Sequence, residues 1–238
     1  MPVVRVDVVA TPELAARRAA LWLADALRDA IRERDRACIA LSGGSSPLPL
    51  FRELVRAELD WSAVHVFQVD ERVVKRGDPA RNLTVLEQVF VHEGPLSAER
   101  LHPMWVDRSD LAAAAEAYAE SLATLAGSPV VLDAVHLGLG ADGHTASLFP
   151  GDAACDVTGS AVAVTGEHAG YRRMTLTYPA LDAARRIVWF ATGEGKQAIV
   201  TRLAAGDATI PAARVATGHA VLVADYAAGR LLAAARPG

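Results

Sequence analysis

Short apolar runs alternate with helical patterns along nearly the whole chain, and this alternation restricts the fold more than any other feature. Runs of strand length are VVRVDVVA (3–10), ACIAL (37–41), VHVFQVD (64–70), VVLDAVHLGLG (130–140), RMTLTY (173–178), RIVWFATG (186–193) and AVLVAD (220–225). Helical patterns lie between them, and the first has Thr11 as its expected N-cap and Pro12 at its first position. The sequence therefore predicts an α/β fold with a mostly parallel central sheet and helices on both faces.

The size and composition of the chain favour one domain without metal or disulfide support. With 238 residues, of which 52% are hydrophobic, residues 1–238 can form a single domain with a sizeable core. The two cysteines imply no disulfide framework, and Cys38 in an apolar run is expected to be a buried thiol. A net charge of −4 without a basic tract argues against nucleic-acid binding. No secretory pattern or long apolar span is seen, so we expect a cytoplasmic protein that does not associate with a membrane.

The loop GLGADGHTASLFPG (138–151) contains the pattern G-x-G-x-x-G after an expected strand, as a dinucleotide-binding turn would. Three features argue against that interpretation. Asp142 would place a carboxylate where a pyrophosphate should lie, and Pro150 with Gly151 limits the following helix to about one turn. The loop also lies past the middle of the chain, whereas this fingerprint belongs to the first βα turn of its fold. NAD binding is therefore disfavoured.

The same loop places Asp142 and His144 on either side of Gly143 at the end of a strand. A histidine can exchange a proton near neutral pH, and a nearby carboxylate can orient it or bind a substrate hydroxyl. The alternative is a turn in which both side chains only satisfy backbone groups.

The segment SGGSSP (42–47) follows an expected strand and opens a helix. Its backbone N–H groups and the hydroxyls of Ser42, Ser45 and Ser46 could surround an anion at the helix N-terminus. No Gly-Lys-Ser/Thr follows, so a Walker A loop is excluded. The alternative is a plain βα turn with Ser46 as N-cap and Pro47 at the first helical position.

Other charged residues stand at the end of one expected strand, just before another, and at the start of a helix. In VDER (69–72), Asp70 and Glu71 are candidates for acid/base work or for binding sugar hydroxyls, and Arg72 for phosphate. The alternative is a solvated cluster of salt bridges. A basic pair at 172–173 and Lys196 in TGEGK could also contact phosphate, although each alone suits a surface charge. The other histidines show no metal-ligand spacing, so no metal site is expected.

Taken in order, SGGSSP, VDER, GLGADGHTASLFPG, RRMTLT and TGEGK resemble the 6-phosphogluconolactonases, over about residues 41–225. The resemblance implies a Rossmann-like fold and hydrolysis of 6-phospho-D-glucono-1,5-lactone to 6-phosphogluconate, the second step of the oxidative pentose phosphate pathway. It implies no metal or organic cofactor, and a small phosphosugar lactone as the binding partner. We further expect a monomer or a weak homo-oligomer.

The related glucosamine-6-phosphate deaminases have a similar Asp-Gly-His stretch but carry a glutamate five residues after the histidine. Here that position is Phe149, and Arg72 stands where the deaminases tend to have tyrosine. Both differences favour the lactonase over a deaminase or isomerase. A non-catalytic phosphosugar sensor is the third alternative, and no helix-turn-helix segment supports it.

The resemblance also assigns roles to residues. His144 would act as general base toward water and then as general acid, because no serine–histidine pairing is implied. Asp70 and Asp142 would hold ring hydroxyls or orient His144. The remaining residues expected to bind the substrate or its phosphate are Ser42, Gly43, Gly44, Ser45, Arg72, Asn82, Arg173 and Lys196. Two of these choices carry open questions: Arg81 stands beside Asn82 in place of the usual neighbour, and Arg173 is preferred to Arg172 because it directly precedes its strand.

Overall fold

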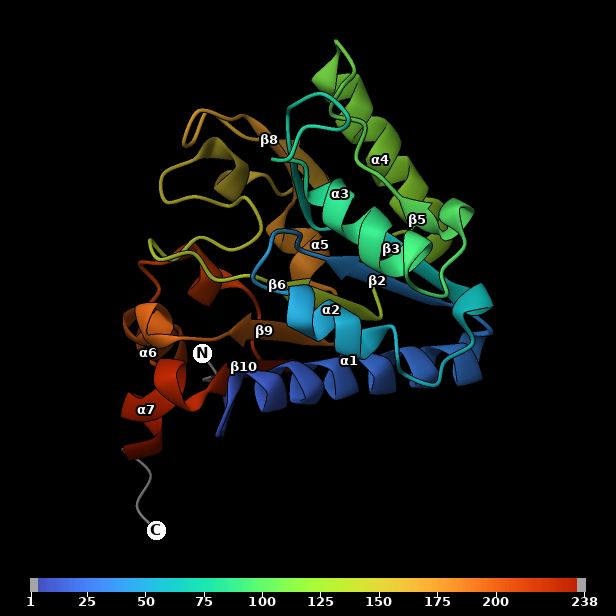
Figure 1. Cartoon of the computed structure of the whole chain (residues 1–238). Helices are drawn as coiled ribbons and strands as arrows, with labels where there is room; N and C mark the ends of the chain where they lie inside the picture. The colour runs from blue at the N-terminus through green and yellow to red at the C-terminus, as the bar shows by residue number, and fades with distance from the viewer. Residues whose placement is uncertain (1–3, 235–238) are drawn as a thin grey trace.

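A seven-stranded parallel sheet forms the centre of the computed structural model, which describes residues 4–234 (Figure 1). All its neighbouring strands pair in parallel. Their order is β1 (Arg5–Val9), β10 (Ala220–Asp225), β9 (Ile187–Ala191), β6 (Ala134–Leu137), β2 (Ala37–Leu41), β3 (Val64–Gln68) and β5 (Leu101–His102). The predicted α/β fold with a mostly parallel sheet is confirmed.

Helices cover both faces of this sheet because its strands are apolar on both sides. In β2, for example, Cys38 and Ala40 belong to one hydrophobic core, while Ile39 and Leu41 belong to the other. One core is closed by α1 (Pro12–Arg34), α2 (Leu48–Leu54) and α3 (Asn82–Leu86). The other is closed by α4 (Leu111–Ala126), α5 (Tyr178–Asp182), α6 (Gln197–Ala204) and α7 (Tyr226–Ala234). Figure 1 shows α1 along the lower edge and α6 beside α7 at the left.

The start of α1 agrees with the sequence. The Thr11 side chain accepts a hydrogen bond from the backbone N–H of Leu14 at 3.3 Å, and Pro12 opens the helix. This cap satisfies one of the N–H groups that a helix leaves unpaired at its first turn. No helix within residues 4–234 is long and apolar enough to cross a membrane.

Two expected strands do not extend the parallel sheet as predicted. The strand expected to end at Asp70 stops at Gln68, and Asp70–Arg72 forms β4 of a second, three-stranded antiparallel sheet. The RMTLTY run forms β8 (Arg173–Leu176), which lies between β4 and β7 (Val162–Val164) in that small sheet. Apolar alternation indicates a strand but not its partner, which explains the difference.

Helix boundaries differ from the sequence expectation at three places. The helical pattern that SGGSSP opens covers residues 47–59, but α2 ends at Leu54, and Pro47 rather than Ser46 is its N-cap residue, with no side-chain cap. Another helical pattern between the expected strands covers residues 83–91, and it forms the short α3 followed by a π-helical turn. The segment HTASLF forms no helix, because Thr145 and Leu148 form an antiparallel bridge with Ala146 at φ 52°.

The strand order places a topological switch point between β2 and β6. The strand after β2 in the chain lies on one side, and the next parallel strand after β6 lies on the other. In open parallel sheets, ligands bind beyond the carboxyl ends of the strands at such a point. The segments that begin at Ser42, Gly138 and Thr192 leave β2, β6 and β9 there.

Candidate active site

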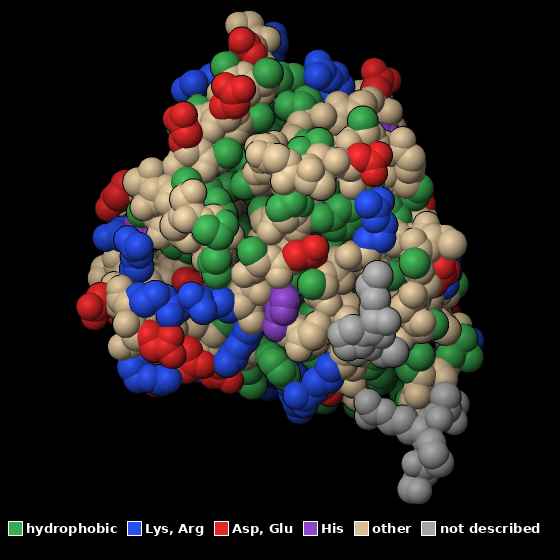
Figure 2. Space-filling view, turned by 180° about the vertical axis from the view of Figure 1, so that it is seen from behind, with side chains coloured by type: hydrophobic (Ala, Val, Ile, Leu, Met, Phe, Trp, Pro, Cys, Tyr) green, Lys and Arg blue, Asp and Glu red, His purple; other side chains and the backbone are tan. Residues whose placement is uncertain are grey.

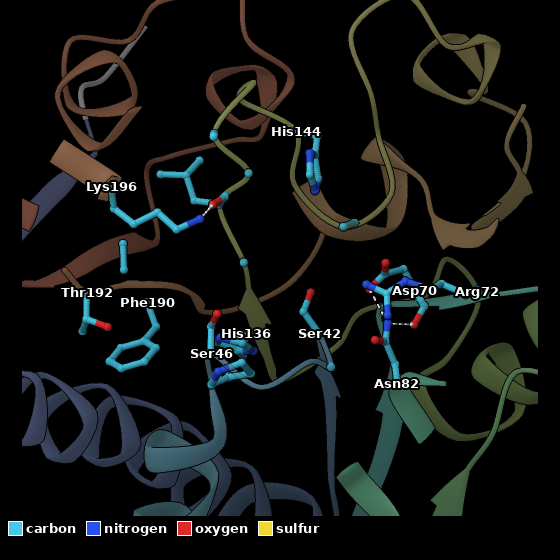
Figure 3. Close-up of a pocket in the computed structure, with 18 residues that line it drawn as sticks. Ser42, Ser46, Asp70, Arg72, Asn82, His136, His144, Phe190, Thr192 and Lys196 are labelled. Carbon is cyan, nitrogen blue, oxygen red and sulfur yellow. Dashed lines mark hydrogen bonds between the residues drawn. The ribbon is translucent and has the colours of Figure 1, made fainter. Parts of the chain in front are cut away.

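A cavity of about 460 Å³ lies at this switch point (Figure 3). Loops after β2, β6 and β9 form most of its wall, and β4 with the start of α3 completes it. Its lining side chains and backbone come from Ser42, Gly43, Ser46, Pro47, Asp70, Arg72, Asn82, His136, Gly138, Leu139, Gly140, Ala141, His144, Ala146, Phe190, Ala191, Thr192 and Lys196. The sequence motifs that follow different strands therefore meet in one place.

His144 forms a histidine–carboxylate pair with Asp142 at the rim of this cavity. The imidazole Nδ1 lies 2.6 Å from Asp142 Oδ1, and that oxygen also accepts the backbone N–H of His144 at 3.2 Å. This contact leaves Nε2 of the neutral ring as the proton acceptor. A β-carbon at Gly140 would overlap both the imidazole and the carboxylate, so only glycine permits this arrangement there.

The Asp142 carboxylate lies behind His144 rather than on the cavity wall. Partial burial acts to raise its pKa, but the hydrogen bonds and positive charge from His144 outweigh this and hold the pKa below its ordinary value. Asp142 is therefore ionised at neutral pH and suited to fix the imidazole. Of the two roles left open for this residue, the contact favours orientation of His144 over binding of a substrate hydroxyl.

Asp70 does border the cavity and is nearly buried. Its Oδ2 accepts a hydrogen bond from Ser147 Oγ at 2.6 Å, and its backbone oxygen accepts one from Asn82 Nδ2 at 3.0 Å. Burial raises the pKa of the Asp70 carboxyl, although the Ser147 hydroxyl opposes the change. The Ser147 hydroxyl thus donates to Asp70 and not to His144. No serine hydroxyl of the described residues hydrogen-bonds to His144.

Glu71 does not reach the cavity, so the sequence interpretation of this residue as an acid/base or sugar-binding group is wrong. Its side chain is fully buried and accepts backbone N–H groups of Arg72, Asn82 and Leu83, each at 2.8 Å. Arg81, 3.2 Å away, is buried as its ion-pair partner. Glu71 and Arg81 thus fix the start of α3, which places Asn82 on the wall.

Arg72 and Lys196 supply positive charge from two sides of the cavity (Figure 3). One N–H of Arg72 donates to the Ala80 carbonyl at 2.7 Å, and Lys196 Nζ donates to the Leu139 carbonyl at 2.6 Å. Neither forms an ion pair with a carboxylate of residues 4–234. Each therefore keeps N–H donors and its positive charge available for an anionic ligand.

The SGGSSP loop reaches the cavity with only part of its residues. Ser42, Gly43 and Ser46 lie on the wall, whereas Gly44 and Ser45 do not. A β-carbon at Gly43 would overlap the Asn82 side chain, so glycine permits the close approach of the β2 loop to α3. Gly44 instead has φ +101° and open space around it, so the backbone conformation of the turn, rather than close packing, favours glycine there.

Arg173 is buried but does not border the cavity. Its guanidinium donates to the carbonyls of His168 at 2.7 Å and Tyr171 at 3.1 Å. Burial, together with the nearby charge of Arg72, lowers its pKa. Its neighbour Arg172 is exposed. The structure therefore gives no direct contact between either arginine and the space available to a ligand.

His136 on β6 lines the cavity, and sequence analysis missed it as one of several scattered histidines. The side chain is 1% exposed, and neither ring nitrogen has a hydrogen-bond partner among the described residues. Burial lowers its pKa to about 3. Its only signal in the sequence was a histidine inside an otherwise apolar run that leads to a glycine loop.

Groups for other chemistry are not seen within residues 4–234. No set of three or more His, Cys, Asp and Glu side chains could hold a metal ion. Cys38 and Cys155 are buried free thiols, and burial raises the pKa of Cys38 to about 12. The face in Figure 2 mixes basic and acidic side chains along its lower left edge rather than gathering one sign of charge.

Comparisons with known proteins identify the family. A family model described as glucosamine-6-phosphate isomerases/6-phosphogluconolactonase matches residues 10–224. A 6-phosphogluconolactonase from Synechocystis sp. is 36% identical over 197 residues, which cover 81% of this chain and 82% of that protein.

Solved structures agree with this match. A crystal structure of a 6-phosphogluconolactonase from Shewanella baltica has a TM-score of 0.81 and 28% identity, and covers 93% of this chain and 97% of its own. A monomeric glucosamine-6-phosphate deaminase also has a TM-score of 0.81, with 95% of this chain and 99% of its own covered, but at 20% identity it shares only the fold. The chain therefore belongs to the family of glucosamine-6-phosphate isomerases/6-phosphogluconolactonase.

Proposed function

We propose that this protein hydrolyses 6-phospho-D-glucono-1,5-lactone to 6-phosphogluconate, the second step of the oxidative pentose phosphate pathway. The observation that carries the proposal is the His144–Asp142 pair, 2.6 Å apart, at a cavity that Arg72 and Lys196 make positive. Relatives named 6-phosphogluconolactonase, at 36% and 38% identity over most of the chain, support the substrate.

His144 acts as the general base in this proposal. Its Nε2 takes a proton from water while the water oxygen forms a bond to the lactone carbonyl carbon. Asp142 holds Nδ1–H and stabilises the imidazolium that results. The tetrahedral intermediate then breaks the bond to the ring oxygen, which takes the proton back from His144. One water is consumed, and no acyl-enzyme forms, since no serine hydroxyl of the described residues hydrogen-bonds to His144.

The 6-phosphate and ring hydroxyls hold the lactone in place for this attack. Arg72 and Lys196 bind the phosphate by charge, with Ser42 and Ser46 as further hydrogen-bond donors. Asp70 and Asn82 face the same cavity and accept or donate bonds to ring hydroxyls. Fixing the phosphate makes the attack effectively intramolecular, which supplies a large part of the rate enhancement.

Phe149 favours lactone hydrolysis over deamination or isomerisation. The deaminases carry a glutamate at this position, and here an aromatic ring lies 4.4 Å from the His144 ring centroid. No carboxylate of the described residues other than Asp142 pairs with His144. The second carboxylate that ring opening would use is therefore missing from this side of the imidazole.

The test measures decay of 6-phosphogluconolactone with and without the protein, at a pH where spontaneous hydrolysis is slow. Glucosamine 6-phosphate runs in parallel with detection of ammonia. We expect faster lactone loss and no ammonia. Ammonia release, or no acceleration by folded protein that binds 6-phosphogluconate, would contradict the proposed reaction.

A further inference from the structure

The Phe149 ring lies between two histidines. One is His144, at a centroid distance of 4.4 Å and an interplanar angle of 39°. The other is His168, at 4.1 Å and 15°, which is a stacked arrangement. Phe149 itself is 7% exposed, so nearly all of its surface is in contact with protein. The proposed base, His144, therefore contacts an aromatic ring that stacks on a second histidine.

His168 is anchored independently of the cavity. Its Nε2 lies 2.7 Å from Asp152 Oδ2, and the same oxygen accepts the Gly166 N–H at 2.9 Å. The other carboxylate oxygen of Asp152 accepts the Ala154 N–H at 2.8 Å. Asp152 is 8% exposed, so its carboxylate is largely shielded from water. His168 is thus held in place and supports the Phe149 ring by stacking on it.

Arg173 fixes the same ring from another direction. Its guanidinium carbon lies 4.8 Å from the Phe149 centroid, within the range of a cation–π contact. The carbonyls of His168 and Tyr171 hold the guanidinium in that place. This gives a role to Arg173, which does not border the cavity.

The His144 ring needs such support. Its side chain is 32% exposed, and Asp142 fixes only one of its ring atoms. One hydrogen bond leaves the plane of the ring free to turn, whereas contact with a fixed aromatic face restricts that plane. Misplacing a catalytic group by about 1 Å can lower the rate on the order of 10²-fold.

We propose that Phe149 is a positioning residue for His144, and that His168, anchored by Asp152, holds Phe149 in place. The inference rests on the proposed function, because it assigns His144 the role of base. Phe149 acts on the orientation of the imidazole rather than on the substrate, since it does not line the cavity. Its loss should therefore change kcat far more than KM.

The test compares Phe149→Leu with Phe90→Leu, a control at a fully buried phenylalanine in the core that α1, α2 and α3 close. We expect Phe149→Leu to lower kcat at least about 10-fold with KM changed less than about 3-fold. Phe90→Leu should leave both constants near wild type, and Phe149→Tyr, which keeps the ring, should restore most of kcat. Equal loss in the two leucine variants, or a rise in KM alone, would overturn the inference.

A second measurement does not depend on turnover. Imidazole ¹⁵N spectra of the wild-type protein should show His144 as the Nδ1-protonated tautomer, because Asp142 accepts that proton. In Phe149→Leu we expect a mixture of tautomers or exchange broadening at His144. If the His144 signal is the same in the wild type and in Phe149→Leu, the positioning role is refuted, whether or not the wild type hydrolyses the lactone. If the signal changes but the wild type does not hydrolyse the lactone, the proposed function is refuted and the positioning role is not.

Discussion

Replacing His136 should make the protein less sensitive to acid. His136 lies on β6 between Leu41 of β2 and Val188 of β9, and its buried ring meets Phe51 edge-on at 5.4 Å. Burial lowers the pKa of His136 to about 3. The native state therefore keeps His136 neutral over most of the acid range.

The magnitude follows from proton linkage. An unfolded histidine titrates near pH ~6.5, whereas His136 in the native state titrates at about 3. Because the native pKa is depressed, the contribution of His136 to the free energy of unfolding is fully present above pH ~6.5. It falls as the pH decreases toward ~3, at up to about 1.4 kcal/mol per pH unit. Between pH 7 and pH 5, the expected loss from this one group is about 2 kcal/mol.

The assay is urea unfolding at pH 7 and pH 5 for the wild type and His136→Leu, which has a similar volume. At pH 7 the variant should be equal in stability or up to about 1 kcal/mol more stable, because no buried ring nitrogen is left unpaired. Between the two pH values, it should lose about 2 kcal/mol less than the wild type. His102 has its pKa lowered to about 4, but it is present in both proteins and cancels.

The control is His92→Leu, at an exposed histidine, which should keep the wild-type loss on acidification. If the wild type and His136→Leu lose the same free energy of unfolding between pH 7 and pH 5, the reasoning is refuted. That result would mean that His136 accepts a proton in the native state through solvent that reaches its ring.

Three further substitutions test the site. His144→Ala should lower kcat by about 10²–10⁴-fold while the circular dichroism spectrum and Tm stay near wild type, and near-normal turnover would exclude the base role. Arg72→Ala should raise KM at least about 10-fold with a small change in kcat, measured by lactone decay; loss of kcat alone would contradict phosphate binding. Gly140→Ala should lower kcat about 10-fold or more, because its β-carbon overlaps the His144 imidazole and the Asp142 carboxylate, and wild-type kinetics would mean that the pair tolerates displacement.

Much of the fold could be predicted because strand and helix patterns are local. The ACIAL run is buried on both faces, and this pattern indicates a central parallel strand without any knowledge of its neighbours. Thr11 and Pro12 form a helix start within four residues. The strand partner of residues 173–176 could not be predicted, because pairing with β4 and β7 depends on contacts distant in the sequence.

The candidate site shows the same division. Asp142 and His144 are two residues apart in one loop, so their pairing could be anticipated from the chain. The bond from Ser147 to Asp70 joins residues 77 positions apart, and nothing local predicts it. Likewise, the sequence places Ser45 in the anion loop but does not show that its side chain lies outside the cavity.

Proteins named 6-phosphogluconolactonase and glucosamine-6-phosphate deaminase share this fold, so the fold alone does not decide between the two reactions. In this chain, the ring of Phe149 occupies the position that would hold a glutamate, and it contacts His144, His168 and Arg173. A carboxylate at that place would lie beside the Arg173 guanidinium and lose the stacked support of His168. The exchange of one residue would then change both the charge near the base and its orientation. Converting this site to deamination therefore requires more than Phe149→Glu, because the environment built by His168 and Arg173 suits a ring.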